Sequence, residues 1–251
     1  MKENYTDNFF DVGSKYGFLP NNHPLESLPS RYKNLQYLLD NMPVKLNDGL
    51  PGYLAVPNKI ENEVENLPNY IDLVKNEDEI LVIQALYRAY CFLTSAYTLE
   101  LSYQEFVKTK KYGKARQILP KQVAQPFVCV AKKLDVYPWL DYHYAYSLGN
   151  YRFLDKSKGF HWSNLDQCVK FSGTSDESGF IMNHVDINQH SPKLVESVIQ
   201  SLKCIEENND KELNKNLKQN FHSMEFVNDR RKDMWAASRW KHYNDFRIFI
   251  M

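Results

Sequence analysis

The sequence lacks an excess of charge of either sign, because 31 Lys and Arg residues balance 31 Asp and Glu residues. A neutral chain has no bulk attraction for nucleic acid or for an anionic membrane surface, so we expect neither as a partner. No stretch reaches the roughly 18 uninterrupted apolar residues of a membrane-spanning helix. The first ten residues include acidic and Asn residues but no apolar core segment, and we therefore expect no secretory signal.

Cysteine is also scarce, with four residues that stand far apart and form no Cys-x-x-Cys pair. Such spacing is typical of reduced thiols in a cytoplasmic protein, which is the location that we predict. The sequence has no Gly-x-Gly-x-x-Gly motif, P-loop, Gly-x-Ser-x-Gly motif or His-Glu-x-x-His motif. His184 and His190 are six residues apart, a spacing that does not suit one metal-binding helix face.

Strand patterns are almost absent, whereas helical periodicity recurs along the chain. Residues 79–99 are apolar almost all round, which predicts a buried helix at the centre of a bundle. Ser191-Pro192 predicts a helix start with Ser as the N-cap. Other helices are predicted over residues 31–41, 119–134, 138–153, 179–189 and 209–238, with a basic loop over 108–114 and a small hairpin over 168–171.

These patterns predict an all-α helical bundle. We place a smaller, loop-rich N-terminal part at residues 1–115 and a larger helical part at residues 116–251. Aromatic residues are abundant, with 17 Tyr and 14 Phe. This content favours ordinary core packing, although it also suits a pocket for a planar ligand.

Residues 141–151 form a Tyr-rich segment with two pairs of side chains at helical spacing. On a helix Tyr142 and Tyr146 would share one face, and His143 and Ser147 would share another. Two interpretations remain open at this point: a Tyr-lined core seam, or one wall of an aromatic pocket.

Residues 179–188 predict a helix on which Phe180, His184 and Ile187 share one face. A His among apolar neighbours is more often a hydrogen-bonded core residue than a ligand or a base. The sequence therefore favours a packing role for His184 and leaves a functional role open.

Arg247 lies within the apolar run that ends the chain. We expect its side chain to be buried, and a buried Arg requires an acidic partner because an unpaired buried charge costs several kcal/mol. The partner is either an acid of the chain, such as Asp245, or the carboxylate of a substrate held by the guanidinium fork.

Taken in order, these segments resemble the indoleamine 2,3-dioxygenase and tryptophan 2,3-dioxygenase superfamily. The resemblance is nearest to its bacterial branch, which includes the ring-rearranging enzyme of the pyrrolnitrin pathway. It spans about residues 12–251 and depends on the order of the motifs rather than on any one of them. The motifs are Tyr16-Gly17-Phe18-Leu19-Pro20, Leu119-Pro120, Ala124-Gln125-Pro126, Leu148-Gly149-Asn150-Tyr151, Gly179-Phe180 and Arg247-Ile248-Phe249.

The resemblance implies a helical fold that binds haem b and uses O₂ to oxidise an aromatic amino acid, tryptophan or a derivative. It implies that Arg247 binds the substrate carboxylate and that His184 and Phe180 are catalytic residues on the distal side, near the substrate ring. Tyr142 or His143 occupies the position of a distal-pocket Tyr, and the alternatives stay open. His242 joins the predicted substrate-binding residues.

The resemblance also predicts what this chain does not contain. None of its seven His residues aligns with the proximal haem ligand of the family, which would lie beyond Met251. We therefore expect a C-terminal truncation or a second chain, and leave a homo-oligomer open.

Two other functions remain open. One is hydroxylation or rearrangement of a tyrosine- or tryptophan-derived precursor of a secondary metabolite by a haem enzyme of the same fold. The other is a helical fragment without catalytic activity.

Overall fold

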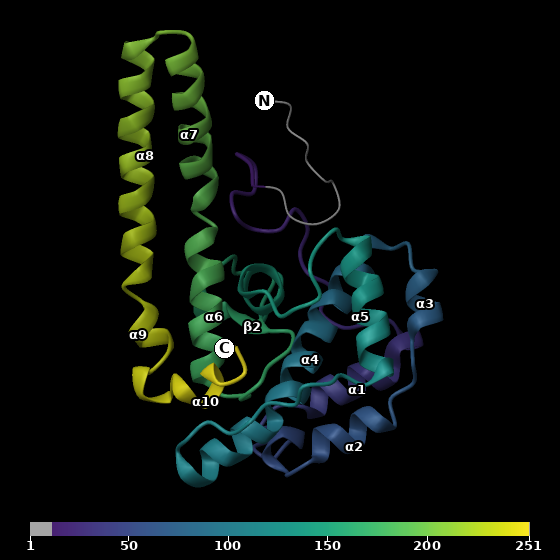
Figure 1. Ribbon diagram of the computed structural model, residues 1–251. Coiled ribbons are helices and arrows are strands. Elements are labelled where there is room, and N and C mark those ends of the chain that lie inside the picture. The colour runs from purple at the N-terminus through teal and green to yellow at the C-terminus, as the bar shows by residue number, and fades with distance from the viewer. Residues whose placement is uncertain (1–11, 251) are drawn as a thin grey trace.

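A computed structural model describes residues 12–250 (Figure 1). The absence of a secretory signal was predicted from the first ten residues, which lie outside this range. Helices account for most of the described chain, which confirms the all-α class. The α-helices are α1 (Lys33–Asn41), α2 (Lys59–Glu65), α3 (Ile71–Lys75), α4 (Ile80–Thr109), α5 (Lys121–Lys133), α6 (Ser175–Asn188), α7 (Ser191–Glu206), α8 (Asp210–Arg231), α9 (Met234–Ala237) and α10 (Asn244–Arg247).

Shorter elements connect these helices. The 3₁₀ turns are η1 (Ser30–Tyr32), η2 (Tyr53–Ala55), η4 (Trp162–Asn164) and η5 (Trp240–His242), and η3 (Tyr142–Leu148) is a π-helix. Strands β1 (Tyr151–Phe153) and β2 (Leu165–Gln167) form an antiparallel pair in which Tyr151 lies opposite Gln167. The predicted hairpin over residues 168–171 was therefore misplaced, because the pairing strands flank a longer loop.

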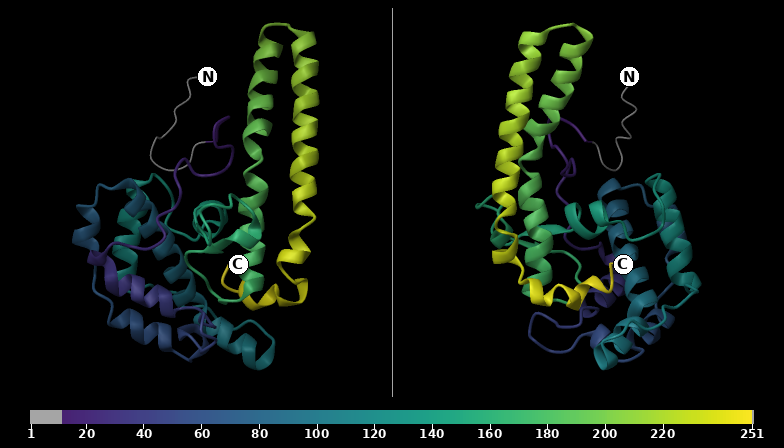
Figure 2. Two further views of the ribbon diagram at one scale, coloured as in Figure 1. Left: turned by 180° about the vertical axis from the view of Figure 1, so that it is seen from behind. Right: turned by 60° about the vertical axis from the view of Figure 1, so that its left-hand side comes forward.

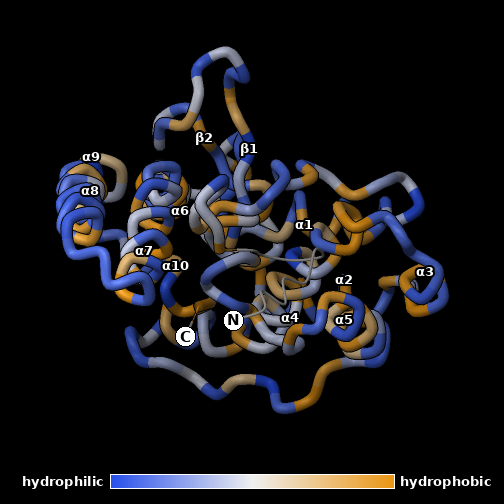
Figure 3. The backbone as a smooth tube through the Cα atoms, turned by 90° about the horizontal axis from the view of Figure 1, so that it is seen from above, coloured by the Kyte–Doolittle hydropathy of each residue, from blue (hydrophilic) through white to orange (hydrophobic). Residues whose placement is uncertain are grey.

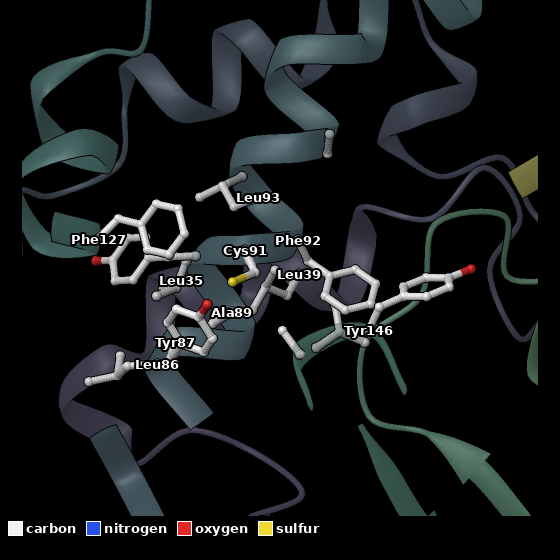
Figure 4. Packing of buried hydrophobic residues seen from close by; sticks show 14 of the residues in the cluster. Leu35, Leu39, Leu86, Tyr87, Ala89, Cys91, Phe92, Leu93, Phe127 and Tyr146 are labelled. Carbon is white, nitrogen blue, oxygen red and sulfur yellow. The ribbon is translucent and has the colours of Figure 1, made fainter. Parts of the chain in front are cut away.

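Helix α4 is the centre of the core, as its apolar sequence predicted. Nearly every residue from Val82 to Leu93 is buried, and α1 and α5 pack against this stretch (Figure 4). The helix is long and apolar enough to cross a membrane, but 78% of that window is buried inside the protein, as expected for a core helix. It continues to Thr109, so the predicted basic loop begins two residues later than expected.

Buried Arg88 joins α4 to two distant segments. Its guanidinium donates to the carbonyl oxygens of Gly149 at 2.7 Å and Leu25 at 2.6 Å. Because α4 also packs against α5 and η3, it contacts both parts of the proposed division at residue 115. That division stays a prediction.

Helix α6 carries two buried acidic residues that hold the C-terminal part of the chain in place. Asp176 accepts hydrogen bonds from the Arg239 backbone N–H at 2.8 Å and from its guanidinium at 2.6 and 2.9 Å. Asp186 accepts from the Arg230 guanidinium at 2.6 and 3.2 Å. One acid lies near each end of α6, so the helix positions both α8 and the segment after α9.

Helices α7 and α8 form a long antiparallel hairpin that stands away from the helices around α4 (Figures 1 and 2). Viewed from above, the hairpin lies at one side of the molecule and α4 and α5 at the other (Figure 3). Ser191 is the first residue of α7 rather than its N-cap, and its hydroxyl accepts from the Phe18 N–H at 2.8 Å. This bond docks the Tyr16–Pro20 motif on the junction between α6 and α7.

Candidate functional site

The predicted site residues on α6 and η3 meet in a small aromatic cluster. The Phe180 and His184 rings, one turn apart on α6, lie 4.9 Å apart between centroids. The Tyr142 ring approaches His184 edge-on at 5.8 Å and lies 5.6 Å from Tyr146. The spacing of Phe180 and His184 could be predicted from the sequence. The contact of His184 with Tyr142 joins residues 42 positions apart and depends on the tertiary fold.

The backbone of η3 determines which residue of the Tyr-rich segment faces α6. An α-helix over residues 138–153 was predicted, but the structure has a π-helix in which Tyr146 N–H donates to Asp141 C=O and Gly149 N–H to Tyr144 C=O. Asp141 caps this turn by accepting from the Tyr144 N–H at 2.6 Å. Wider i to i+5 turns are rare and occur often at functional sites, because they change the direction of side chains.

Tyr142 and His143 are both exposed, but Tyr142 is the one whose ring contacts His184 and Tyr146. The Tyr142 surface is 43% exposed, yet desolvation of its hydroxyl raises its pKa, so it keeps its proton. Desolvation lowers the pKa of His143. The geometry therefore places Tyr142 in the aromatic cluster.

The C-terminal segment adds the third side of the cluster. Tyr243 lies 5.2 Å from Phe180, and Phe246 lies 5.7 Å from Phe180, both between ring centroids. The Arg247 guanidinium lies 5.8 Å from the centre of the Tyr243 ring. Tyr243 was not among the predicted site residues, and only its position four residues before Arg247 could have suggested it.

The prediction that Arg247 is buried was wrong. Its side chain is exposed, whereas Phe246, Ile248 and Phe249 are buried. The cause is the turn of α10, which directs the apolar neighbours into the core and the cation outward. The exposed guanidinium contacts an aromatic ring and can reach an added ligand without first losing a buried acidic partner.

His242 lies at the margin of this cluster. Its side chain is half-buried, and its Nδ1 is 3.1 Å from the Asp245 carboxylate. Asp245 was the internal partner considered for Arg247, but in the structure it pairs with His242. A substrate-binding role for His242 stays a prediction.

Two close contacts that the sequence did not reveal hold the C-terminal segment against α6 and α4. A Cβ added at Gly179 would lie 1.8 Å from the Ala237 carbonyl oxygen, so the absence of a side chain allows α9 to touch α6. The Ser95 hydroxyl on α4 donates to the Phe249 carbonyl, and the Phe249 ring stacks on Phe171 at 5.0 Å. Arg247 is therefore positioned from both α6 and α4.

The hydrogen bonds of His184 determine its neutral tautomer. Its Nδ1 lies 2.8 Å from the Phe180 carbonyl oxygen, which can only accept, so Nδ1 carries the proton. The lone pair of Nε2 then remains as the acceptor, 3.5 Å from the Tyr142 hydroxyl. The ring therefore presents an acceptor at the edge of the aromatic cluster.

Burial lowers the pKa of His184 below its ordinary value of 6.5, with desolvation as the larger effect and the Phe180 carbonyl opposing it. We expect the imidazole to titrate below pH 6.5 in a ¹³C or ¹⁵N NMR titration and to show the Nδ1–H tautomer above it. Because the folded pKa is the lower one, the unfolded chain takes up this proton first, and His184 destabilises the fold as the pH falls below 6.5. A midpoint above 6.5, or the Nε2–H tautomer, would contradict this arrangement.

The sequence of the chain matches one known family. The family model for indoleamine 2,3-dioxygenase matches residues 6–251. The chain belongs to the indoleamine 2,3-dioxygenase family. It is 25% identical over 210 residues to Indoleamine 2,3-dioxygenase 1 of Rattus norvegicus, covering 83% of this chain and 46% of that relative.

A second relative gives the same picture. Indoleamine 2,3-dioxygenase 2 of Mus musculus is 25% identical over 199 residues, which cover 78% of this chain and 43% of the relative. The chain thus spans less than half the length of the curated relatives that it matches.

Proposed function

We propose that this chain provides the substrate side of a haem-dependent oxygenase that acts on an aromatic amino acid, tryptophan or a derivative. The observation that carries the proposal is the order of groups along the cluster. Phe180 and Tyr243 are in contact, the acceptor Nε2 of His184 lies beside the first, and the Arg247 cation lies beside the second. Tryptophan has the matching order of indole N–H, ring face and carboxylate.

Each side chain has a distinct role in this proposal. Phe180 and Tyr243 offer ring faces and edges for an aromatic substrate at little cost in side-chain entropy. His184 accepts a hydrogen bond from an indole N–H, and its lowered pKa keeps it neutral and able to accept at neutral pH. Arg247 binds the carboxylate through its planar fork. Together they hold the ring in one orientation, which is a positioning contribution to the rate.

The residues of the cluster fit the substrate side of a haem pocket. Tyr142, Phe180 and Tyr243 present a partly exposed aromatic wall, and aromatic surface suits a flat, mostly apolar macrocycle. Bound haem would supply the activation of O₂. Within residues 12–250, no group of three or more His, Cys, Asp or Glu side chains gathers at a metal-binding distance. We assign no axial ligand, and the proximal His predicted beyond Met251 stays a prediction.

The test is a haem titration of the purified chain with added imidazole, which can take the place of a proximal His beyond Met251, followed by incubation with L-tryptophan, a reductant and O₂. We expect a Soret band that shifts when L-tryptophan is added, and a product heavier by two oxygen atoms. A product heavier by one oxygen atom would instead favour the hydroxylating alternative, and a product without added oxygen would favour rearrangement. A chain that gives no Soret band after haem addition would contradict the proposal and favour a non-catalytic helical module.

A further inference from the structure

The hairpin of α7 and α8 exposes an apolar face that the cluster around His184 does not use. Besides Phe226, six large apolar side chains of the hairpin are between 46% and 61% exposed. They form one row on each helix, at i, i+4 and i+7. The α7 row is Val198, Leu202 and Ile205, and the α8 row is Leu217, Phe221 and Met224.

The seam between the two helices consists of small and polar side chains instead. Asn220 Nδ2 donates to Ser197 Oγ at 3.1 Å, and Asn216 Nδ2 lies 3.5 Å from Cys204 Sγ. Ser201 is also buried, and its hydroxyl bonds back to its own helix. Small residues let the helices approach closely, so the larger apolar side chains are not needed to join them.

The two apolar rows lie on the same side of the hairpin. Each apolar residue of a row comes directly after a seam residue in the sequence, as Val198 comes after Ser197 and Phe221 after Asn220. One residue corresponds to a rotation of about 100° around the helix axis. Because α7 and α8 are antiparallel, the same rotation about each axis turns both rows to one side. The opposite side is polar and forms a hollow of 390 Å³ lined by Glu196, Gln200, Lys215, Gln219 and neighbours.

We propose that this apolar face binds the same face of a second copy of the chain, forming an antiparallel four-helix bundle. Six half-exposed apolar side chains amount to several hundred Å² on one copy, the range in which a contiguous apolar patch indicates an interaction site. Pairing two copies removes roughly 1,000 Å² from water, the lower limit for a specific interface. A twofold axis matches a face to itself, so one sequence supplies both partners.

Two further properties favour this occupant. A two-helix face presented by a hairpin completes a four-helix bundle when it meets another two-helix face, a common packing solution for such hairpins. The formal net charge is zero, so two copies approach each other without bulk repulsion. The proposed dimer leaves the aromatic cluster around His184 unaltered, so it can fail or succeed independently of the proposed function.

The test compares a variant of the apolar face with a matched variant of the polar face. Leu202→Glu with Phe221→Glu puts two charges on the apolar rows, and Gln200→Glu with Gln219→Glu puts the same two charges on the opposite side. Both variants change exposed residues, so we expect their far-UV circular dichroism and melting curves to match the parent chain. Sedimentation velocity from 1 to 100 µM then measures the association.

We expect the parent chain and the polar-face variant to dimerise, and the apolar-face variant to be at least tenfold weaker in association. A parent chain that stays monomeric at 100 µM would overturn the proposal. That result would leave the face to another polypeptide, such as the part of the family fold that this chain does not span. A dimer that both variants retain equally would overturn it as well, because its interface would lie elsewhere.

Discussion

Gly179→Ala is expected to destabilise the protein strongly and to separate α9 from α6. The new Cβ would lie 1.8 Å from the Ala237 carbonyl oxygen and 2.5 Å from its carbonyl carbon, and both atoms belong to a backbone that can yield only by moving the segment. Overpacking of this kind costs roughly 1–3 kcal/mol, occasionally more, and we expect the upper end. Urea unfolding followed by circular dichroism measures the loss.

The control for this prediction is Gly13→Ala, because a Cβ at Gly13 meets no atom within 4 Å. We expect the control to leave the free energy of unfolding almost unchanged. In Gly179→Ala, the displaced segment should also alter the NMR signals of the Tyr243 ring, which contacts Phe180 from that segment. An unchanged unfolding midpoint in Gly179→Ala would show that α9 does not rest on α6 as described.

Arg247→Ala is expected to lower the affinity for L-tryptophan by about 10- to 30-fold, and this prediction rests on the proposed function. Hydrogen bonds between charged groups contribute roughly 1.5–3 kcal/mol, and an exposed site gives the lower part of that range. The affinity for tryptamine, which lacks the carboxylate, should change little. Isothermal titration calorimetry of the haem-loaded chain measures both ligands.

Lys241→Ala is the matched control, because Lys241 is an exposed cation in the same segment. It should bind L-tryptophan as the parent chain does. If Arg247→Ala loses affinity for tryptamine as much as for L-tryptophan, the residue shapes the site rather than binding the carboxylate. If it loses neither, the proposed orientation of the substrate is wrong.

Local sequence patterns predicted the elements that local physics controls. The apolar run of α4 can only be stable when it is buried on all sides, and its sequence alone therefore placed it in the core. The i, i+4 spacing of Phe180 and His184 on α6 fixed their contact, because a helix turn brings such residues together whatever surrounds it. Ser191-Pro192 predicted the start of α7 to within one residue, because the preference of Ser and Pro for the first positions of a helix is also local.

Other features depended on contacts between distant segments. Arg247 was predicted to be buried because its neighbours are apolar, yet the direction of each side chain depends on how α10 docks against α4 and α6. The π-helix of η3 depends on the Asp141 cap and on Tyr144, whose ring packs within 2.7 Å of the position that a Gly149 Cβ would occupy. Periodicity assumed an ordinary α-helix there and could not choose between Tyr142 and His143.

The apolar face of the hairpin is a second case in which a local pattern does not predict burial. Val198, Leu202 and Ile205 repeat at helical spacing on α7, a pattern typical of a buried helix face, yet these side chains are exposed, and the fold buries Val195, Ser197, Ser201 and Cys204 on this helix. Hydrophobic periodicity indicates which face of a helix is apolar, but it does not indicate which surface packs against that face.

The sequence by itself thus determined the helical class, the central helix α4 and the contact of Phe180 with His184 on α6. It also contained, in order, the motifs that resemble the indoleamine 2,3-dioxygenase family. Only the tertiary structure decided that Tyr142 faces His184, that Tyr243 links Phe180 to Arg247, and that the Arg247 cation is exposed. The physical reason is the range of the interactions. Helix geometry fixes neighbours three or four residues apart, whereas contacts such as that of Gly179 with Ala237 exist only when the packing of the whole chain brings them together.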